Sequence, residues 1–251
     1  METVDSLLTR DRRDDRTALV DATGREFDVH WLCTTSWKAG NFLRHSGVRE
    51  GVTVGIVGSG PLALLAFFGT TLLEGTTRFD PPADLTGDTE FRTLVAPTDD
   101  VGSYDLPRGA QRVCYGDEPD EPGVHHFDAG LWSENPSFPP LSISPDTTLL
   151  TDGDRRLTHE EALEAAREVI DEHGLEEGDR VVVRAPLSDP RTVIAGVIAP
   201  LLAGGVIVLT DGEHADADVV ADDGDDGRGD VAVSSEPVLE PGQIDVNADD
   251  C

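Results

Sequence analysis

The clearest pattern along the chain is an apolar strand followed by an apolar helix and a second strand. Residues 52–57 form a continuous, largely β-branched run, which is typical of a strand buried on both faces. Pro61 stands at the start of a helical run over 62–73, where its missing N–H costs little. Gly75 ends that run and precedes a further strand pattern at 76–79. This order predicts a β-α-β unit with parallel strands and a right-handed crossover.

The same pattern recurs in the second half of the chain. Residues 47–51 read GVREG before the first strand, and residues 174–178 read GLEEG before another strand at 181–183. A helical run over 192–202 and a strand at 206–209 complete the second copy. A repeat this long indicates a duplicated supersecondary unit instead of a solenoid of short repeats. We therefore predict an α/β fold with parallel-rich sheets flanked by helices and an internal duplicated β-α-β unit.

A hairpin and a helix precede each copy. The first copy follows a hairpin at 17–28 and a helix with apolar spacing over 31–43. The second follows a hairpin with its turn at 152–154. The next helix starts at Thr158, which forms a capping box with Glu161. The order hairpin, helix, strand, helix, strand therefore occurs twice.

These patterns divide the chain into an extension, a domain and a tail. Residues 1–16 alternate charges and contain no apolar segment of a secretory signal. The domain is predicted to comprise a first unit at 17–80, a connector at 81–146 and a second unit at 147–210. The connector is rich in proline, so we expect mostly loop with short strands at 92–96 and 112–115. Residues 211–251 indicate an acidic, partly disordered tail, in which 231–233 could add one strand.

An excess of acidic residues narrows the classes of partner. The 251 residues include 50 Asp+Glu against 19 Lys+Arg, for a formal net charge of -31. Because the acid is spread along the chain and Lys38 is the only lysine, we expect a halophilic protein whose self-repulsion is screened by salt. An acidic tail on an ordinary domain is the alternative. Nucleic acid and anionic membranes are excluded as partners because both require clustered basic residues.

Cysteine and histidine positions indicate no metal site. Cys33, Cys114 and Cys251 belong to no C-x-x-C motif, and scattered thiols suit a reducing cytoplasm. His125 and His126 are adjacent, and their loop offers no second pair at ligand spacing. We therefore expect a cytoplasmic protein without a bound metal.

A glycine turn after the first buried strand is a candidate dinucleotide site. Residues 58–63 read GSGPLA and fit G-x-G-x-x-G/A, with Asp80 placed where a ribose-binding acid is expected. Gly58 and Gly60 would then admit a pyrophosphate to the N-terminus of the helix. The motif follows about fifty residues of other structure, whereas it usually opens its domain. The second copy has APLS at the equivalent turn, residues 185–188.

The repeated pattern resembles the front half of the adenylate-forming superfamily, the acyl-CoA synthetases and AMP-dependent ligases. Residues 47–51 and 174–180 resemble its two G-L-x-x-G-D-R motifs, and residues 18–27 resemble its opening hairpin. Residues 79–81 stand where the family has a v-P-l-d-P turn, and residues 200–204 match the l-L-x-G end of a later helix. The likeness covers the whole predicted domain and implies a truncated N-terminal subdomain of such a ligase.

The junction before the capped helix departs from the family. There the family has the phosphate loop T-S-G-T-T-G-x-P-K-G, whereas residues 150–159 read LTDGDRRLTH. Thr151 and Gly153 match the start of the loop, and the segment after them is missing. Asp152 and Asp154 would repel a triphosphate unless Mg²⁺ intervened. The resemblance thus implies a deleted phosphate loop, with Thr151 and Gly153 as the residues left to hold ATP or AMP.

Further departures favour a protein without its own chemistry. The family's Y-G-x-T-E motif and C-terminal lysine domain have no counterpart here, and Lys38 is not placed to replace that lysine. Charge on a pentavalent phosphorus requires preorganised cations, so we expect no catalytic residue and no cofactor. The leading hypothesis is a pseudoenzyme that serves as a regulatory or partner subunit, for example of a full-length acyl-CoA synthetase. The alternatives are a dinucleotide-binding protein using Gly58 and Gly60, and a non-catalytic module that binds an acyl group or a nucleotide.

Overall fold

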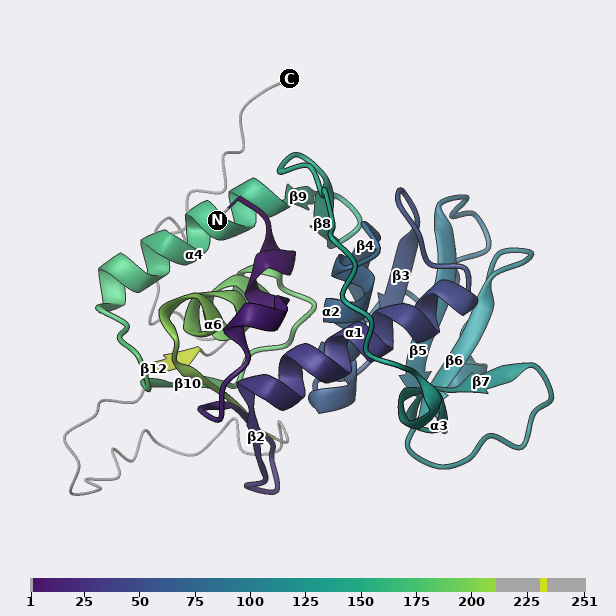
Figure 1. Cartoon of the computed structure of the whole chain (residues 1–251). Helices are drawn as coiled ribbons and strands as arrows, with labels where there is room; N and C mark the ends of the chain where they lie inside the picture. The colour runs from purple at the N-terminus through teal and green to yellow at the C-terminus, as the bar shows by residue number, and fades with distance from the viewer. Residues whose placement is uncertain (1, 211–230, 234–251) are drawn as a thin grey trace.

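Two β-sheets with helices packed against them form the fold (Figure 1). The computed structural model describes residues 2–210 and the backbone of 231–233. The seven-stranded sheet has the order β7-β6-β5-β3-β4-β8-β9 and comprises β3 (Thr53–Ile56), β4 (Thr76–Phe79), β5 (Phe91–Pro97), β6 (Gln111–Tyr115), β7 (Val124–His126), β8 (Thr148–Thr151) and β9 (Arg156–Thr158). The five-stranded sheet has the order β12-β10-β11-β1-β2 and comprises β1 (Thr17–Val20), β2 (Glu26–Asp28), β10 (Arg180–Val183), β11 (Val206–Leu209) and β12 (Val231–Val233).

The helices connect and cover these sheets. They are α1 (Val29–His45), α2 (Pro61–Thr71), α3 (Phe127–Ser133), α4 (His159–His173), α5 (Pro190–Val193) and α6 (Ala199–Ala203), with a π-helical turn η4 (Ile194–Ile198) joining α5 to α6. Three 3₁₀ turns are η1 (Val4–Leu8), η2 (Arg10–Arg12) and η3 (Val101–Ser103). Figure 1 shows α1 crossing the middle of the molecule, from β2 toward the seven-stranded sheet. Among the described residues, no helix is both long and apolar enough to cross a membrane.

The predicted α/β class and the duplicated β-α-β unit are confirmed. Helix α2 connects the parallel neighbours β3 and β4, and the run from α5 to α6 connects the parallel neighbours β10 and β11. The likeness extends one strand further, because β5 pairs with β3 as β12 pairs with β10, in parallel. The strand that the sequence indicates at 231–233 is thus present as β12, paired in parallel with β10.

Each unit contributes its hairpin to the sheet of the other unit. The β1–β2 hairpin comes from the first unit, and β1 pairs in parallel with β11, with Leu19 opposite Ile207. The β8–β9 hairpin comes from the second unit, and β8 pairs in parallel with β4, with Thr77 opposite Leu150. Periodicity along the chain carries no information about this exchange, since it depends on which strands meet in space.

Local signals set the helix boundaries. Helix α2 is buried on all sides, which explains its continuous apolar sequence, and Pro61 occupies its first turn. The capping box of α4 is formed, since Glu161 N–H donates to Thr158 Oγ1 at 3.3 Å and Thr158 N–H donates to Glu161 Oε2 at 2.7 Å. Helix α2 ends at Thr71, earlier than the pattern indicates, and Glu74, just before Gly75, takes a left-handed backbone conformation with a φ of 57°.

The segment between the units is more regular than its prolines indicate. Besides β5 and β6 it contributes the edge strand β7 and the helix α3, neither of which the sequence pattern predicts. Helix α3 buries Phe127 and Leu131 and leaves Trp132 with 87% of its surface exposed.

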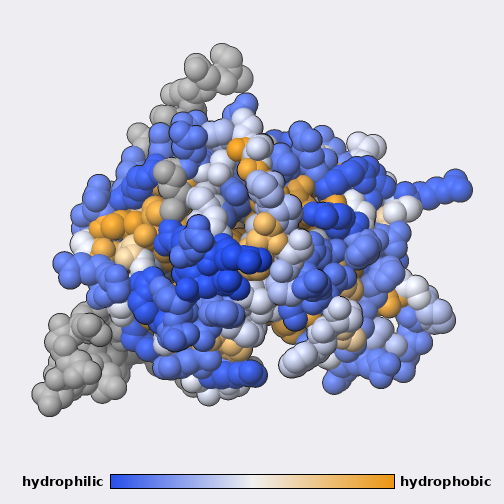
Figure 2. Space-filling model, viewed as in Figure 1, coloured by the Kyte–Doolittle hydropathy of each residue, from blue (hydrophilic) through white to orange (hydrophobic). Residues whose placement is uncertain are grey.

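Most of the face in Figure 2 is hydrophilic, with apolar residues scattered between, as the acidic composition leads one to expect.

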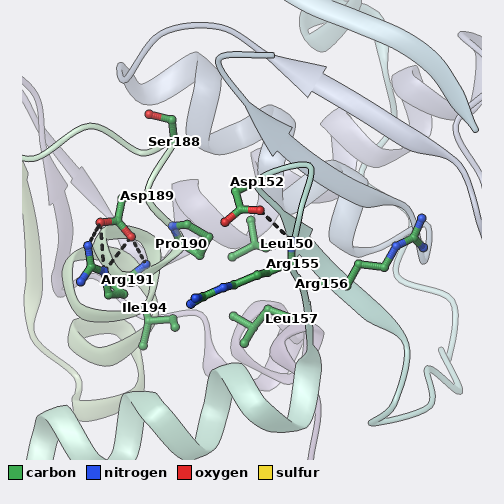
Figure 3. A pocket seen from close by; sticks show the side chains of 10 residues that line it. All are labelled: Leu150, Asp152, Arg155, Arg156, Leu157, Ser188, Asp189, Pro190, Arg191 and Ile194. Atoms are coloured by element: carbon green, nitrogen blue, oxygen red, sulfur yellow. Dashed lines mark hydrogen bonds and ion pairs between the residues drawn. The ribbon is translucent and has the colours of Figure 1, made fainter. Parts of the chain in front are cut away.

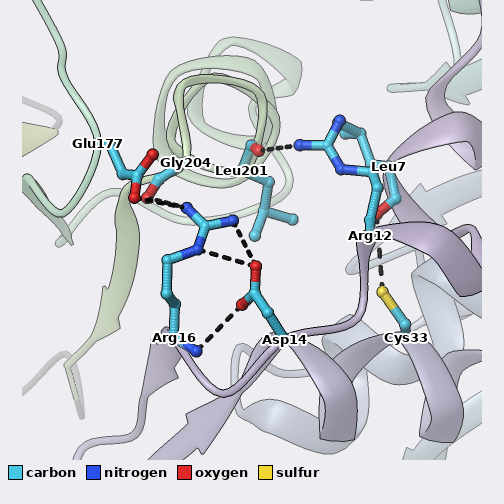
Figure 4. A network of polar contacts seen from close by, with 8 residues as sticks. All are labelled: Leu7, Arg12, Asp14, Arg16, Cys33, Glu177, Leu201 and Gly204. Carbon is cyan, nitrogen blue, oxygen red and sulfur yellow. Dashed lines mark hydrogen bonds and ion pairs between the residues drawn. The ribbon is translucent and has the colours of Figure 1, made fainter.

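The N-terminal residues are part of the core and not an appendage. Val4, Leu7 and Leu8 are buried, and the Trp37 indole N–H donates to Leu8 O at 2.8 Å. Arg12 and Arg16 reach the end of α6 (Figure 4). Arg12 donates to Leu201 O at 3.2 Å, and Arg16 donates to Gly204 O. We define residues 3–16 as the N-terminal strap.

Helices α1 and α2 approach each other closely through glycine. A Cβ on Gly69 would lie 2.8 Å from Gly40 N and 2.9 Å from the Ala39 side chain. These distances are shorter than side chains tolerate, and backbone atoms cannot rotate away. The closeness of the two helices therefore depends on the absence of a side chain at Gly69.

We expect Gly69→Ala to lower the free energy of unfolding by about 1–3 kcal/mol, because overpacking forces α1 and α2 apart. Gly87→Ala is the control, since a Cβ there meets nothing within 4 Å. Urea unfolding midpoints in molar KCl measure both changes. Equal midpoints for the two variants would contradict the tight helix contact.

Candidate functional site

The two sets of candidate residues lie at one edge of the seven-stranded sheet. Strands β3, β4 and β8 are parallel neighbours in that order. The Gly58 turn follows β3, Asp80 follows β4, and Thr151 ends β8. The carboxyl edge of a parallel sheet is where ligands commonly bind in α/β proteins. The fold thus brings together residues that the sequence assigns to alternative hypotheses.

The Gly58 turn is closed by a carboxylate of the protein itself. Gly58 N–H donates to Asp80 Oδ1 at 3.2 Å, and the Tyr115 hydroxyl donates to Val57 O at 2.6 Å. Gly58 has a φ of 93°, and a Cβ there would collide with the Tyr115 hydroxyl. The amide that a pyrophosphate would need is therefore already bonded to an anion. Gly60 has open space around its Cα and forms the N-cap of α2.

Asp80 acts as a cap for this turn instead of facing outward toward a ribose. Burial raises the pKa of the Asp80 carboxyl, and the hydrogen bond from Gly58 opposes that rise. Tyr115 stands in the space that glycine leaves free, and burial likewise raises the pKa of its phenol. Both side chains hold the turn by hydrogen bonds, Asp80 at Gly58 N–H and Tyr115 at Val57 O.

The β8–β9 turn is also closed on itself. Gly153 N–H donates to Thr151 Oγ1 at 3.1 Å, and that hydroxyl donates to Arg155 O at 2.7 Å. Asp152 Oδ1 accepts from Asp154 N at 2.9 Å and from Arg155 N at 2.8 Å. Three successive amides are therefore satisfied by side chains of the turn. Thr151 and Gly153 do lie together, but they bond to each other.

A cavity of about 490 Å³ lies between this hairpin and the turn that leads from β10 into α5 (Figure 3). Its apolar walls include Leu150 and Leu157 from the hairpin and Ile194 from η4. The cavity therefore lies between structural elements of the two sheets. Its volume is in the range of pockets that hold small organic molecules.

Most charged groups of the cavity are already paired. Arg191 donates to both oxygens of Asp189 at 3.0 Å and makes a further bond of 2.6 Å. Burial disfavours the Asp189 carboxylate, but these bonds outweigh it and lower its pKa. Arg156 pairs with Glu90 and points away from the cavity (Figure 3). Asp152 is engaged by the turn amides.

Arg155 is the exception. Its side chain extends into the cavity between the two walls in Figure 3, and its guanidinium has no hydrogen-bond or ion-pair partner within residues 2–210. The sequence pattern at this junction predicts only the repulsion of a triphosphate by its aspartates. The structure also places the guanidinium of Arg155 beside Asp152. Arg155 lies in the turn just before β9, so strand alternation does not predict the direction of its side chain.

Groups that could hold a metal are absent from the described part of the chain. No three His, Cys, Asp or Glu side chains gather at metal-binding geometry there. His126 Nε2 lies 3.1 Å from Gly116 O, and Asp128 accepts from Gly116 N–H at 3.0 Å, so both side chains tie down a loop.

Comparisons with known proteins define the class of the fold. No family model and no curated protein matches this sequence. The N-terminal domain of FACL13 from Mycobacterium tuberculosis superposes with a TM-score of 0.73 at 15% identity, covering 86% of this chain and 58% of that one. The anthranilate CoA ligase AuaEII in complex with anthranoyl-AMP gives 0.72 at 19% identity, covering 85% and 46%.

A third structure agrees. ATP-bound MatB from Rhodopseudomonas palustris gives a TM-score of 0.67 at 15% identity, covering 83% of this chain and 44% of that one. The chain thus spans about half the length of the ligases it superposes on. The described residues have the fold of the N-terminal part of adenylate-forming ligases, as the resemblance of the motifs implied.

We expect Asp152→Ala to lower the urea midpoint at pH 7, because it frees two turn amides. Hydrogen bonds, first from Arg155 N–H, lower the pKa of the Asp152 carboxyl. A carboxyl whose pKa is lower in the folded state than in the unfolded state stabilises the fold at every pH above the ordinary aspartate pKa. This stabilisation is lost as the pH falls through the folded-state pKa. The midpoints of variant and wild type should therefore converge as pH falls below the ordinary aspartate pKa. Asp154→Ala is the control, and an equal effect of both variants at pH 7 would contradict the role of Asp152.

Proposed function

We propose that this chain is a ligase-fold module that does not adenylate, and that it serves as a regulatory or partner subunit, for example of a full-length acyl-CoA synthetase. One observation carries the proposal. At both turns where a nucleotide phosphate could bind, the amides are bonded to side chains of the protein, Gly58 to Asp80 and the β8–β9 turn to Asp152 and Thr151.

Electrostatics support the same proposal. A phosphate approaching either turn would replace an existing hydrogen bond and face a carboxylate at close range. Binding would require cations aimed at the phosphates, since charge developing in phosphoryl or adenylyl transfer must be stabilised in place. Of the three arginines that line the cavity, Arg191 and Arg156 are held by Asp189 and Glu90, which leaves Arg155 as a single cation beside Asp152. We propose that this chain alone neither uses ATP, which is bound in the superposed MatB structure, nor forms an acyl-AMP such as the anthranoyl-AMP of the AuaEII structure.

The cellular setting is part of the proposal. A formal net charge of -31 supports work at high salt, where repulsion between surface carboxylates is screened. Cys33 and Cys114 are buried free thiols, in keeping with a reducing cytoplasm. Assays are therefore designed in molar KCl.

We expect no AMP or acyl-adenylate above background when the chain is incubated with Mg²⁺-ATP and a panel of organic acids in molar KCl. Mass spectrometry of the nucleotides is the measurement, with an active acyl-CoA synthetase as positive control. Sustained AMP release that follows protein concentration would refute the proposal.

The partner role has its own test. The chain is added to an acyl-CoA synthetase that copurifies with it in molar KCl, and kcat and KM are compared with and without it. A reproducible change in either constant is expected. A stable complex with unchanged constants, or no complex at all, would remove the regulatory role.

Arg155 favours a second candidate, a module that binds a small organic acid without converting it. An unpaired guanidinium above apolar walls matches a carboxylate joined to an apolar body. Within the described residues no other cavity-facing cation lacks a partner. The acid would lie along Leu157 and Ile194 with its carboxylate at Arg155.

We expect hexanoate to bind with calorimetric heat in molar KCl, and hexanamide, which lacks the charge, to bind less tightly. Arg155→Gln should weaken hexanoate binding by about 10- to 100-fold, the range for loss of a charged hydrogen bond of about 1.5–3 kcal/mol. Arg156→Gln is the matched control and should retain wild-type affinity. Equal affinity of wild type and Arg155→Gln would refute this candidate.

A further inference from the structure

We propose that His159 is an acid-sensitive latch for the N-terminal strap: protonation of its imidazole releases residues 3–8 from α4 and opens the core beneath them. The latch is a single buried contact. Val4 N–H donates to His159 Nδ1 at 3.1 Å, and both residues have no exposed surface. This inference concerns the N-terminal strap and goes beyond the proposed function.

The contact fixes the protonation state of the ring. Because Nδ1 accepts a hydrogen bond, the neutral ring carries its proton on Nε2. A second proton must go to Nδ1, where it would face the Val4 N–H, so two donors would meet and the bond would be lost. The charged ring can be hydrated only if the strap opens, because His159 has no exposed surface while the strap is closed.

Nothing nearby compensates the charged ring through a hydrogen bond. His159 Nε2 and Asp5 Oδ1 are buried atoms without a partner in the described chain. In the neutral ring the Nε2 proton is already present, and it forms no hydrogen bond to Asp5. Protonation of Nδ1 therefore adds an electrostatic attraction between the ring and Asp5 but no new hydrogen bond. His159 is also the first residue of α4, where the positive end of the helix dipole opposes a cation.

The charged groups around the ring come from two elements. Asp5 lies on the strap and favours the charged form, while Glu160 and Glu161 follow on α4, where Glu161 is engaged in the capping box. Burial dominates and lowers the pKa of His159 to about 4, against the opposing effect of Asp5. The closed strap therefore excludes the proton that an open strap would bind.

The strap covers groups that report its opening. Leu7 O accepts from the Cys33 thiol at 3.7 Å, and Leu8 O accepts from the Trp37 indole at 2.8 Å. Arg12 and Arg16 anchor the other end of the strap at α6, through Leu201 O and Gly204 O (Figure 4). Release of residues 3–8 is thus a local opening that exposes Cys33.

The direction of the pH effect follows from the lowered pKa. Above about pH 6.5, the ordinary histidine value, neither state binds the proton and closure is strongest. Between pH 6.5 and about 4 the open state binds a proton that the closed state does not, so opening increases roughly five- to tenfold per pH unit.

The experiment measures labelling of Cys33 in the full chain with 4,4′-dithiodipyridine, which reacts with thiols in acid, from pH 7 to 4.5 in molar KCl. Peptide mass spectrometry separates Cys33 from Cys114, which is also buried and serves as the internal reference. The ratio of the Cys33 rate to the Cys114 rate is expected to rise steeply below pH 6.5. A flat ratio, or equal increases at both thiols as in global unfolding, would overturn the proposal.

Variants assign the effect to His159. His159→Asn keeps an acceptor near the place of Nδ1 and cannot titrate, so the rise should disappear, whereas the exposed His45→Asn should keep it. Asp5→Asn removes a charge that favours the protonated ring while the strap is closed, so the rise should still begin near pH 6.5 and should continue to lower pH than in the wild type. This variant tests the latch even if His159→Asn fails to fold. A rise that persists in His159→Asn, or that disappears in Asp5→Asn, would refute the latch.

Discussion

The reciprocal exchange of hairpins is the constraint on which the rest of the structure depends. Strand β1 completes the sheet built by β10 and β11, and β8 lies beside β4 in the sheet of the first unit. Neither β-α-β unit covers its own sheet edge, so each requires the other for its hydrogen bonds. The same exchange places the β8–β9 turn at the edge that carries Gly58 and Asp80, and it forms the cavity between the sheets.

Carboxylates are structural ligands of backbone amides throughout this acidic chain. Asp21, Asp84 and Asp152 each accept amide hydrogen bonds within a turn, and these bonds contribute to lowering the pKa of each side chain. Asp80 does the same for Gly58, 22 positions earlier in the chain. Some of the aspartates that give the chain its large negative charge thus stabilise turns by accepting hydrogen bonds from backbone amides. This use of aspartate conflicts with phosphate binding, because the amides that would receive a phosphate are already occupied.

The sequence contains enough information for the fold class and for most regular elements. Apolar runs define β3 and α2, and Thr158 with Glu161 defines the start of α4, because these signals are local. Strand β7 and helix α3 are short and lie among prolines, so their stability comes from packing that no local pattern records. The strap was missed for the same reason: its three apolar residues are sparse among charges, yet all are buried. At the site, the proximity of Asp80 to Gly58 depends on the sheet order, and the direction of Arg155 depends on the turn before β9, which no strand pattern covers.

The pairing of β1 with β11 has a consequence for synthesis on the ribosome. Residues 17–20 emerge early, and their partner at 206–209 follows only after most of the chain has been made. The edge of β4 likewise stays unpaired until β8, which lies much later in the sequence, has been made. Contacts so distant in sequence slow folding, since loop closure must precede the bonds that reward it. Nascent chains therefore carry open strand edges, which can pair with other chains, until these later strands have been made.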